Sequence, residues 1–260
     1  MVRALFGTMR ERLPWRLKLG GAFLCLIVTA SCSSEQSWEQ TLHAGQQALG
    51  QGKEQEAVRL LTAAVTQAEA FGKSDARLGL SLSSLAQAYA MYGKYVEAEP
   101  LYQRALGIFQ QAYGDDHLEV ASTLNNLGVL HRMHGQYAEA EPLLQRSLTI
   151  KEKLLGVNHP EVALGLRNLA MLYQSDGRLD QAAAAFRKAL ALKEKALGLE
   201  HPEVAKSLED LAGALRKAGR DEEADALQAR AAAMKAKAAG LKTAASPSDT
   251  ADSAGPSAGR

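Results

Sequence analysis

The chain contains few cysteines and few aromatic residues. Only 2 of its 260 residues are cysteine, and 5% are aromatic. Two cysteines cannot build a disulfide framework or a cysteine-rich metal site. Scarce aromatic residues combined with many alanines and leucines favour helices over a β-sandwich. Because 47% of the residues are hydrophobic and 23% are charged, the composition indicates a folded protein of one or two domains, and excludes a wholly disordered one.

Basic side chains are concentrated near the N-terminus. Five of the 30 basic and one of the 29 acidic side chains lie within residues 1–31, which leaves the rest of the chain with a net charge of −3. A body with that charge lacks the basic surface by which proteins bind nucleic acid. The sequence therefore predicts no nucleic-acid partner.

The first 31 residues have the pattern of a targeting segment. Residues 1–18 are basic, and the 12 residues of Leu19–Ala30 are almost wholly apolar. A helix of that length covers about 18 Å, whereas the hydrocarbon core of a bilayer is about 30 Å thick. A cleaved signal peptide over residues 1–31 is therefore favoured over a membrane-spanning helix. Both Met1 and Met9 are suitable starts.

The residues that follow the apolar segment resemble a bacterial lipobox. Val28–Cys32 reads VTASC, in which Thr29 replaces the usual leucine. The resemblance implies that Cys32 is lipidated, that residues 32–37 are a short tether, and that the protein is anchored in the cell envelope facing the periplasm. Ser33 after the cysteine implies the outer membrane. The alternative is a soluble secreted or periplasmic protein with Cys32 unmodified.

Equivalent residues recur every 42 positions along the chain. The register is kept by glycine, leucine and histidine, at Gly93, Gly135, Gly177 and Gly219, at Leu85, Leu127, Leu169 and Leu211, and at His117, His159 and His201. Within each repeat the apolar residues follow a helical period on both sides of the first glycine. Each repeat is therefore predicted to be a pair of helices, A and B, which buries its apolar faces only by stacking on its neighbours.

This register predicts where the helices lie. We expect four 42-residue repeats over 76–240, the last one capping, with helices at 76–92 and 95–113, 118–134 and 137–155, 160–176 and 179–197, and 202–218 and 221–238. A degenerate repeat over 38–75 is expected to hold helices at 38–50 and 54–71. Residues 241–260 are rich in Ser, Ala, Pro and Gly and are expected to be a disordered tail.

The repeat resembles the tetratricopeptide repeat. The pattern W-x2-L-G-x2-Y of its first helix is matched by Leu124, Leu127, Gly128 and His131, and the small–large–small pattern of its second helix by Ala140, Leu144 and Ser147. The 42-residue length resembles the kinesin-light-chain type. The resemblance implies an all-α, right-handed superhelical solenoid of antiparallel helix pairs. It also implies a non-catalytic adaptor that binds a protein or peptide on a concave surface lined by the A helices.

Motifs for catalysis are absent from the sequence. It contains no glycine-rich phosphate loop, no H-E-x-x-H and no G-x-S-x-G, so we expect no enzyme, no cofactor and no small-molecule substrate. His131 and His134, three apart on one helix, leave a metal site as an alternative; His131 occupies the tyrosine position of the repeat, which favours packing. The periodic histidines His117, His159 and His201 are expected to cap the helix that follows or to pack between linkers.

The candidate partner-binding residues are the outward positions of the A helices, by resemblance to the family. They are Asn125, Asn126, Arg132, Arg167, Asn168, Met171 and Gln174. Amides pair with a peptide backbone, arginine clamps carboxylates, and methionine adapts to irregular shapes. For Asn126 and Asn168 a bridge between neighbouring helices is an equal alternative, and for the arginines the alternative is an ordinary solvated face.

Overall fold

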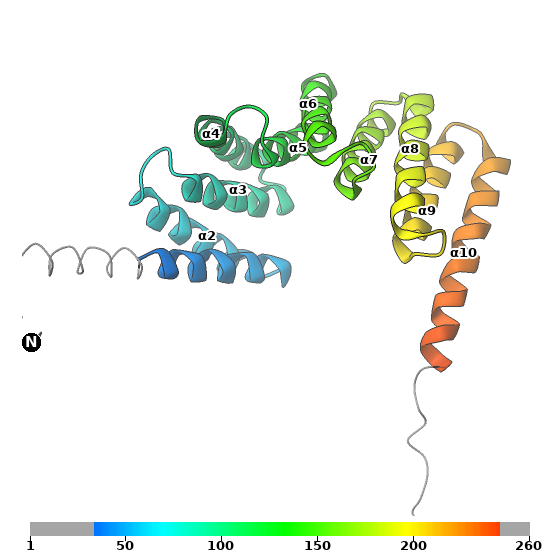
Figure 1. Ribbon diagram of the computed structural model, residues 1–260, viewed down its shortest axis with the longest axis horizontal. Helices are drawn as coiled ribbons and strands as arrows, with labels where there is room; N and C mark the ends of the chain where they lie inside the picture. Colours follow the sequence, from blue (N-terminus) through cyan, green and yellow to red (C-terminus); the bar gives the residue numbers. More distant parts are fainter. Residues whose placement is uncertain (1–33, 245–260) are drawn as a thin grey trace, which may run out of the picture. The chain divides into compact units, whose positions relative to one another are not determined.

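The computed structural model describes residues 34–244, with side chains up to residue 238, and every regular element in that range is a helix. Residues 34–50, the first described part of the chain, are helical. They are followed by α2 (Glu54–Glu69), α3 (Ala76–Met91), α4 (Tyr95–Tyr113), α5 (Leu118–Met133), α6 (Tyr137–Leu155), α7 (Pro160–Ser175), α8 (Leu179–Leu197), α9 (Pro202–Lys217) and α10 (Asp221–Ala244) (Figure 1). The predicted signal peptide, Cys32 and most of the predicted tail lie outside the described residues.

The helices form two compact units. Unit 1 ends at Ala112, and unit 2 begins at Tyr113. In unit 2, α5 packs on α6, α7 on α8, and α9 on α10, so each 42-residue repeat is one helix pair. In addition, α6 packs on α7 and α8 packs on α9, and these contacts join successive helix pairs. The predicted helix pairs are therefore present, and the all-α fold is confirmed.

Alanine and leucine fill the core of unit 2. The large core side chains Leu124, Leu144 and Leu172 are at most 1% exposed. Of the small positions in helix B, Ala140 and Ala182 are completely buried. Where α5 crosses α6, a Cβ on Gly128 would lie 2.6 Å from Cγ of Leu144. The two helices approach this closely because glycine leaves room for the leucine.

A side chain at the same repeat position caps the A helices α3, α5, α7 and α9. Nδ1 of His117, His159 and His201 each accepts a hydrogen bond of 3.2 Å from the backbone N–H two residues later. In α3 the equivalent residue is Asp75, whose Oδ1 accepts from the Arg77 N–H at 2.9 Å. These bonds satisfy donors that a helix N-terminus leaves unpaired. The prediction that the periodic histidines cap helices is confirmed.

The linkers before the A helices are tied to the end of a helix B. Ser74 donates to Gln111 at 2.9 Å in unit 1, and Lys195 donates to Asn158 at 3.2 Å in unit 2. Two further bonds occupy the same repeat positions, from Lys153 to Asp116 and from Lys237 to Glu200. In each case the partners are 37 residues apart. A polar link between stacked pairs therefore recurs with the repeat.

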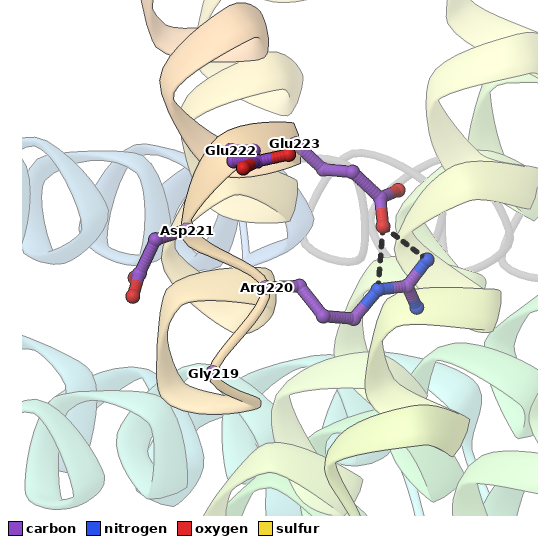
Figure 2. Close-up of a pocket in the computed structure, with 5 residues that line it drawn as sticks. All are labelled: Gly219, Arg220, Asp221, Glu222 and Glu223. Atoms are coloured by element: carbon purple, nitrogen blue, oxygen red, sulfur yellow. Dashed lines mark hydrogen bonds and ion pairs between the residues drawn. The ribbon is translucent and has the colours of Figure 1, made fainter.

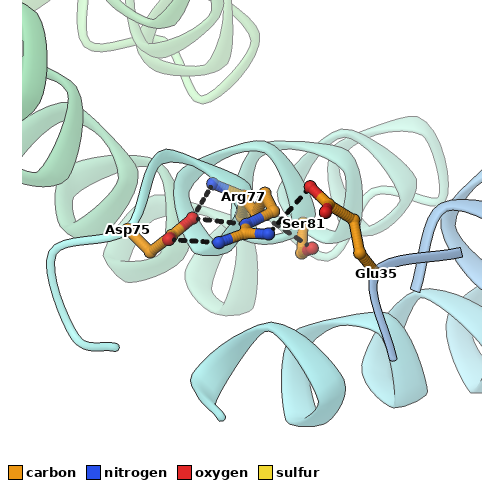
Figure 3. A network of polar contacts seen from close by, with 4 residues as sticks. All are labelled: Glu35, Asp75, Arg77 and Ser81. Atoms are coloured by element: carbon orange, nitrogen blue, oxygen red, sulfur yellow. Dashed lines mark hydrogen bonds and ion pairs between the residues drawn. The ribbon is translucent and has the colours of Figure 1, made fainter. Parts of the chain in front are cut away.

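The first helix begins earlier than predicted. Residues 34–37, expected to be part of a tether, are helical. Arg77 binds Glu35 at 2.9 Å and Asp75 at 2.7 Å (Figure 3), and Nε1 of the buried Trp38 donates to Ser81 at 2.8 Å. These contacts dock residues 35 and 38 of the first helix on α3, so the part of the chain expected to be a tether takes part in the fold.

The last helix ends later than predicted. α10 continues to Ala244, six residues past the expected end at 238, so the beginning of the supposed disordered tail at 241–244 is helical. In earlier repeats the helix B ends at a glycine with positive φ, as at Gly156 and Gly198. Gly240 has the same register but lies within α10. Alanine, leucine and lysine around it favour continuation of the helix.

Candidate functional site

The predicted binding residues lie on the A helices of unit 2. They belong to three rows that run across α5, α7 and α9. We call these nine residues the helix-A face: Asn125, Arg167 and Glu209; Val129, Met171 and Gly213; and Arg132, Gln174 and Arg216. Glu209 and Arg216 are exposed and the other seven are half-buried. Asn126 and Asn168 are half-buried beside the first row.

Amide side chains link α5 to α7. Nδ2 of Asn168 donates to Oδ1 of Asn125 at 2.7 Å. Nδ2 of Asn125 in turn lies 3.4 Å from Oδ1 of Asn126. Asn168 therefore bridges neighbouring helices, which is one of the two roles that the sequence suggested for it. The same bond fixes the orientation of both amides on the face, and their binding to a peptide backbone stays a prediction.

Arg167 is held by an acid of the next repeat. Its Nε donates to Oδ2 of Asp210 at 2.6 Å, and its second contact with this carboxylate is 3.4 Å long. Both side chains are only 23% exposed. The sequence interpretation missed Asp210, although the 42-residue register places it at the position of Asn126 and Asn168. Arg167 therefore already has a carboxylate partner within unit 2, and its use as a clamp for a ligand carboxylate remains a prediction.

The charged residues of the helix-A face that lie on α9 form ion pairs with residues of α10. Lys235 binds Glu209 at 2.6 Å, and Arg216 binds Asp225 at 2.6 Å. Arg216 also donates to Gln228 at 2.9 Å. Because these charges are paired inside unit 2, the remaining contact surface is formed mainly by the second row and by Gln174.

The second row combines apolar side chains with open space. Met171 packs in part against the core cluster formed by α7 to α10, and Val129 against the cluster formed by α6 and α7. The same row position on α9 is Gly213, where an added Cβ would have nothing within 4 Å. Gln174 is half-buried in the third row next to Met171. This part of the face offers apolar and amide contacts and room for a partner group.

His131 packs at the turn of its helix pair. Its Nδ1 lies 2.7 Å from Oε1 of Gln136. At the same two repeat positions, the Arg178 guanidinium stacks on the Tyr173 ring at 4.4 Å. His131 therefore takes the structural place of the repeat's tyrosine. Among residues 34–238, no group of three or more His, Cys, Asp or Glu side chains is arranged to hold a metal, so His131 and His134 have no third ligand there.

The carboxylates with shifted pKa values are partners of arginines. Hydrogen bonds from Arg77, Arg178 and Arg220 lower the pKa of Asp75, Glu141 and Glu223, respectively. An acid held in its ionised form by an arginine stabilises the fold and is a poor proton donor at neutral pH. These shifts are explained by structural ion pairs.

A hollow of about 390 Å³ lies where α10 begins, lined by residues 219–223 (Figure 2). Its polar groups pair with one another: Nε of Arg220 donates to Oε1 of Glu223 at 2.7 Å. The other oxygen of Glu223 accepts from Arg187 at 2.9 Å. These pairs close the turn between α9 and α10.

Within residues 34–244, none of the helices combines the length and the apolar character needed to cross a bilayer.

Comparison with known proteins identifies the class to which this α-helical solenoid belongs. The tetratricopeptide repeat family model matches residues 39–111, 82–153, 135–195 and 161–237. The chain therefore belongs to the tetratricopeptide repeat family. Proteins of this family are non-catalytic scaffolds for interaction, and this chain is one of them. No protein with a curated description matches it in sequence.

Solved structures share the fold. A putative kinesin light chain of Podosopora anserina with nearly identical TPR-like repeats is 28% identical, with a TM-score of 0.67 over 77% of this chain and 95% of that one. BtubC (BKLC) from P. vanneervenii is 23% identical, with a TM-score of 0.68 over 90% and 97%. The Rap conjugation gene regulator of plasmid pLS20, in complex with the Phr* peptide, is 16% identical, with a TM-score of 0.62 over 91% and 60%. The kinesin-light-chain resemblance is confirmed.

Proposed function

We propose that this protein is an interaction scaffold of the bacterial cell envelope. It is attached to the outer membrane through a lipid on Cys32, faces the periplasm, and holds a segment of a partner protein on the helix-A face of unit 2. Membership of the tetratricopeptide repeat family supports the scaffold role. The Rap regulator, which has this fold, is in complex with a peptide, and this supports a peptide segment as the ligand.

The observation that carries the binding proposal is that polar side chains of the helix-A face are held in place by one another. The Asn168–Asn125 bond and the Arg167–Asp210 pair fix polar side chains before any partner arrives. A surface fixed in advance loses less conformational entropy on binding. Next to these pairs, Met171 and Gln174 offer apolar and amide contacts, and Gly213 leaves space for a partner group.

The start of the first helix supports attachment close to the membrane. Residue 34 is already helical, and Glu35 is paired with Arg77. Two residue steps from Cys32 to position 34 span at most about 7 Å. A lipid on Cys32 would therefore hold unit 1 next to the bilayer surface, where the partner is another envelope protein or one that passes near this membrane.

Replacement of Cys32 tests the anchor. We expect the wild-type chain to incorporate labelled fatty acid and to sediment with outer membranes, whereas Cys32→Ser loses the label and enters the soluble periplasmic fraction. A wild-type chain that takes up no label and fractionates as a soluble periplasmic protein, as Cys32→Ser does, would support the alternative of a soluble binding module and contradict the lipid anchor.

Filling the space at Gly213 tests the binding face. A photo-crosslinking amino acid at position 174 should form a discrete adduct in intact envelopes, and Gly213→Leu should remove most of it. Gly107→Leu on α4 is the matched control, because Gly107 is also helical with nothing within 4 Å of an added Cβ. An adduct that persists in Gly213→Leu, or that is lost equally in Gly107→Leu, contradicts the proposed face.

A further inference from the structure

Unit 2 contains a second hollow, which lies away from the helix-A face. It has a volume of about 280 Å³ and lies between α7 and α8. Its lining residues are Leu166, Leu169, Tyr173, Gln181, Ala184, Ala185 and Lys188. Leu169 and Ala185 are buried and form an apolar floor, whereas Gln181 and Lys188 are exposed at the rim.

Two small residues on α8 create this hollow. The positions of Ala184 and Ala185 are occupied by proline and leucine in the two preceding repeats, as Pro100-Leu101 and Pro142-Leu143. Ala185 thus lacks a leucine side chain that α4 and α6 both carry at the equivalent position, where it is half-buried. The repeat therefore tolerates a leucine there, and a leucine at position 185 would fill part of the hollow.

Lys188 stands at the mouth of the hollow without an acid partner. The cations at the same position in the other helices B are all paired: Arg104 with Glu69 at 3.1 Å, Arg146 with Asp115 at 2.9 Å, and Arg230 with Glu194 at 2.7 Å. Lys188 makes no hydrogen bond or ion pair with any residue between 34 and 238. Within residues 34–238, Lys188 is therefore the one cation at this repeat position without an acid partner, and it lies beside an apolar hollow.

We propose that this hollow is a binding site for a peptide segment in which an aliphatic residue is followed by an aspartate or glutamate. The aliphatic side chain occupies the space above Leu169 and Ala185, and the carboxylate pairs with Lys188. The volume of about 280 Å³ lies at the small end of the range for ligand sites and leaves room for a whole aliphatic side chain. The site is independent of the helix-A face and of the lipid anchor.

The test uses the full chain and two short peptides, acetyl-Leu-Glu-amide and acetyl-Leu-Gln-amide. Saturation transfer to the leucine methyl groups, followed by titration, measures the binding of each peptide. We expect the glutamate peptide to bind about threefold more tightly, the gain typical of one exposed ion pair. Ala185→Leu should weaken both peptides about tenfold or more because the anchor loses its site. Lys188→Ala should remove only the preference for glutamate.

Two variants serve as controls. Ala229→Leu adds the same side chain on an exposed position of α10, and Lys206→Ala removes an exposed charge on α9; both should bind as the wild type does. Equal binding of either peptide to wild type and Ala185→Leu, with helicity intact, would overturn the proposal. It is also overturned if octanoate binds more tightly than the glutamate peptide, which would make the site one for fatty acids.

Discussion

At the residue scale, the repeat assigns one role to different side chains. Asp75 caps α3, and histidine caps α5, α7 and α9 from the same register. The sequence predicted the histidine caps, because each histidine directly precedes an A helix, but it did not predict the Asp75 cap. It could not predict the Arg167–Asp210 pair, because that contact depends on how far one helix is displaced against the next.

Removal of one histidine cap should destabilise unit 2. His159→Ala leaves the Glu161 N–H without its acceptor, and the loss of a cap costs about 1 kcal/mol. His159→Asp should retain most of the stability, because aspartate performs this function at position 75. Urea unfolding followed by circular dichroism measures both. Equal stability of the alanine variant and the wild type would show that the cap contributes nothing.

The Asp75–Arg77 pair should make unit 1 sensitive to acid. The hydrogen bond from Arg77 lowers the pKa of Asp75, so folding is favoured by the ionised carboxylate. Its contribution is complete above the unfolded pKa of about 3.9 and is lost as the pH falls through the lower folded value.

Asp75→Asn separates the charge from the cap, because asparagine also caps helices well. We expect this variant to be less stable than the wild type at pH 7 and the difference to shrink below about pH 4, near the ordinary value for aspartate. A difference that stays constant from pH 7 to pH 2 would contradict the assigned ion pair. Chemical unfolding at each pH provides the measurement.

At the element scale, glycines and prolines marked most helix boundaries correctly. Gly135 has a φ of 81° between α5 and α6, and Pro160 and Pro202 begin α7 and α9, as their types predict. The helix boundaries predicted near residues 38 and 238 were wrong, because no further repeat continues the register beyond these helices. At one end Glu35 is drawn into the fold by Arg77, and at the other α10 extends past Gly240.

Two helical glycines should respond oppositely to alanine. In Gly128→Ala the new Cβ would lie 2.6 Å from Cγ of Leu144 and 3.2 Å from the Ala140 carbonyl oxygen, so we expect a loss of about 1–3 kcal/mol. In Gly213→Ala nothing lies within 4 Å, and a gain of about 0.5–1 kcal/mol follows from the higher helix propensity. Thermal unfolding of both variants checks the signs; destabilisation by Gly213→Ala would mean that its space is not open.

At the scale of the whole molecule, the 42-residue register predicted the fold class and the family, because four copies reinforce one another. The helices that carry the candidate residues followed directly from that register. The register did not predict which charges of the helix-A face are paired. Pairs such as Glu209–Lys235 join residues 26 positions apart on different helices. The sequence thus located the face but not which of its charges were already neutralised.

The central claim is that a partner contacts the helix-A face, and a crosslinking scan of unit 2 tests it most directly. A photo-crosslinking residue is placed in turn at positions 171 and 174 of α7, at 213 of α9, and at Thr149 on the exposed side of α6. The account predicts one common adduct from the three helix-A positions in intact envelopes and none from position 149. An adduct that forms only from position 149, or equally from all four, would contradict it.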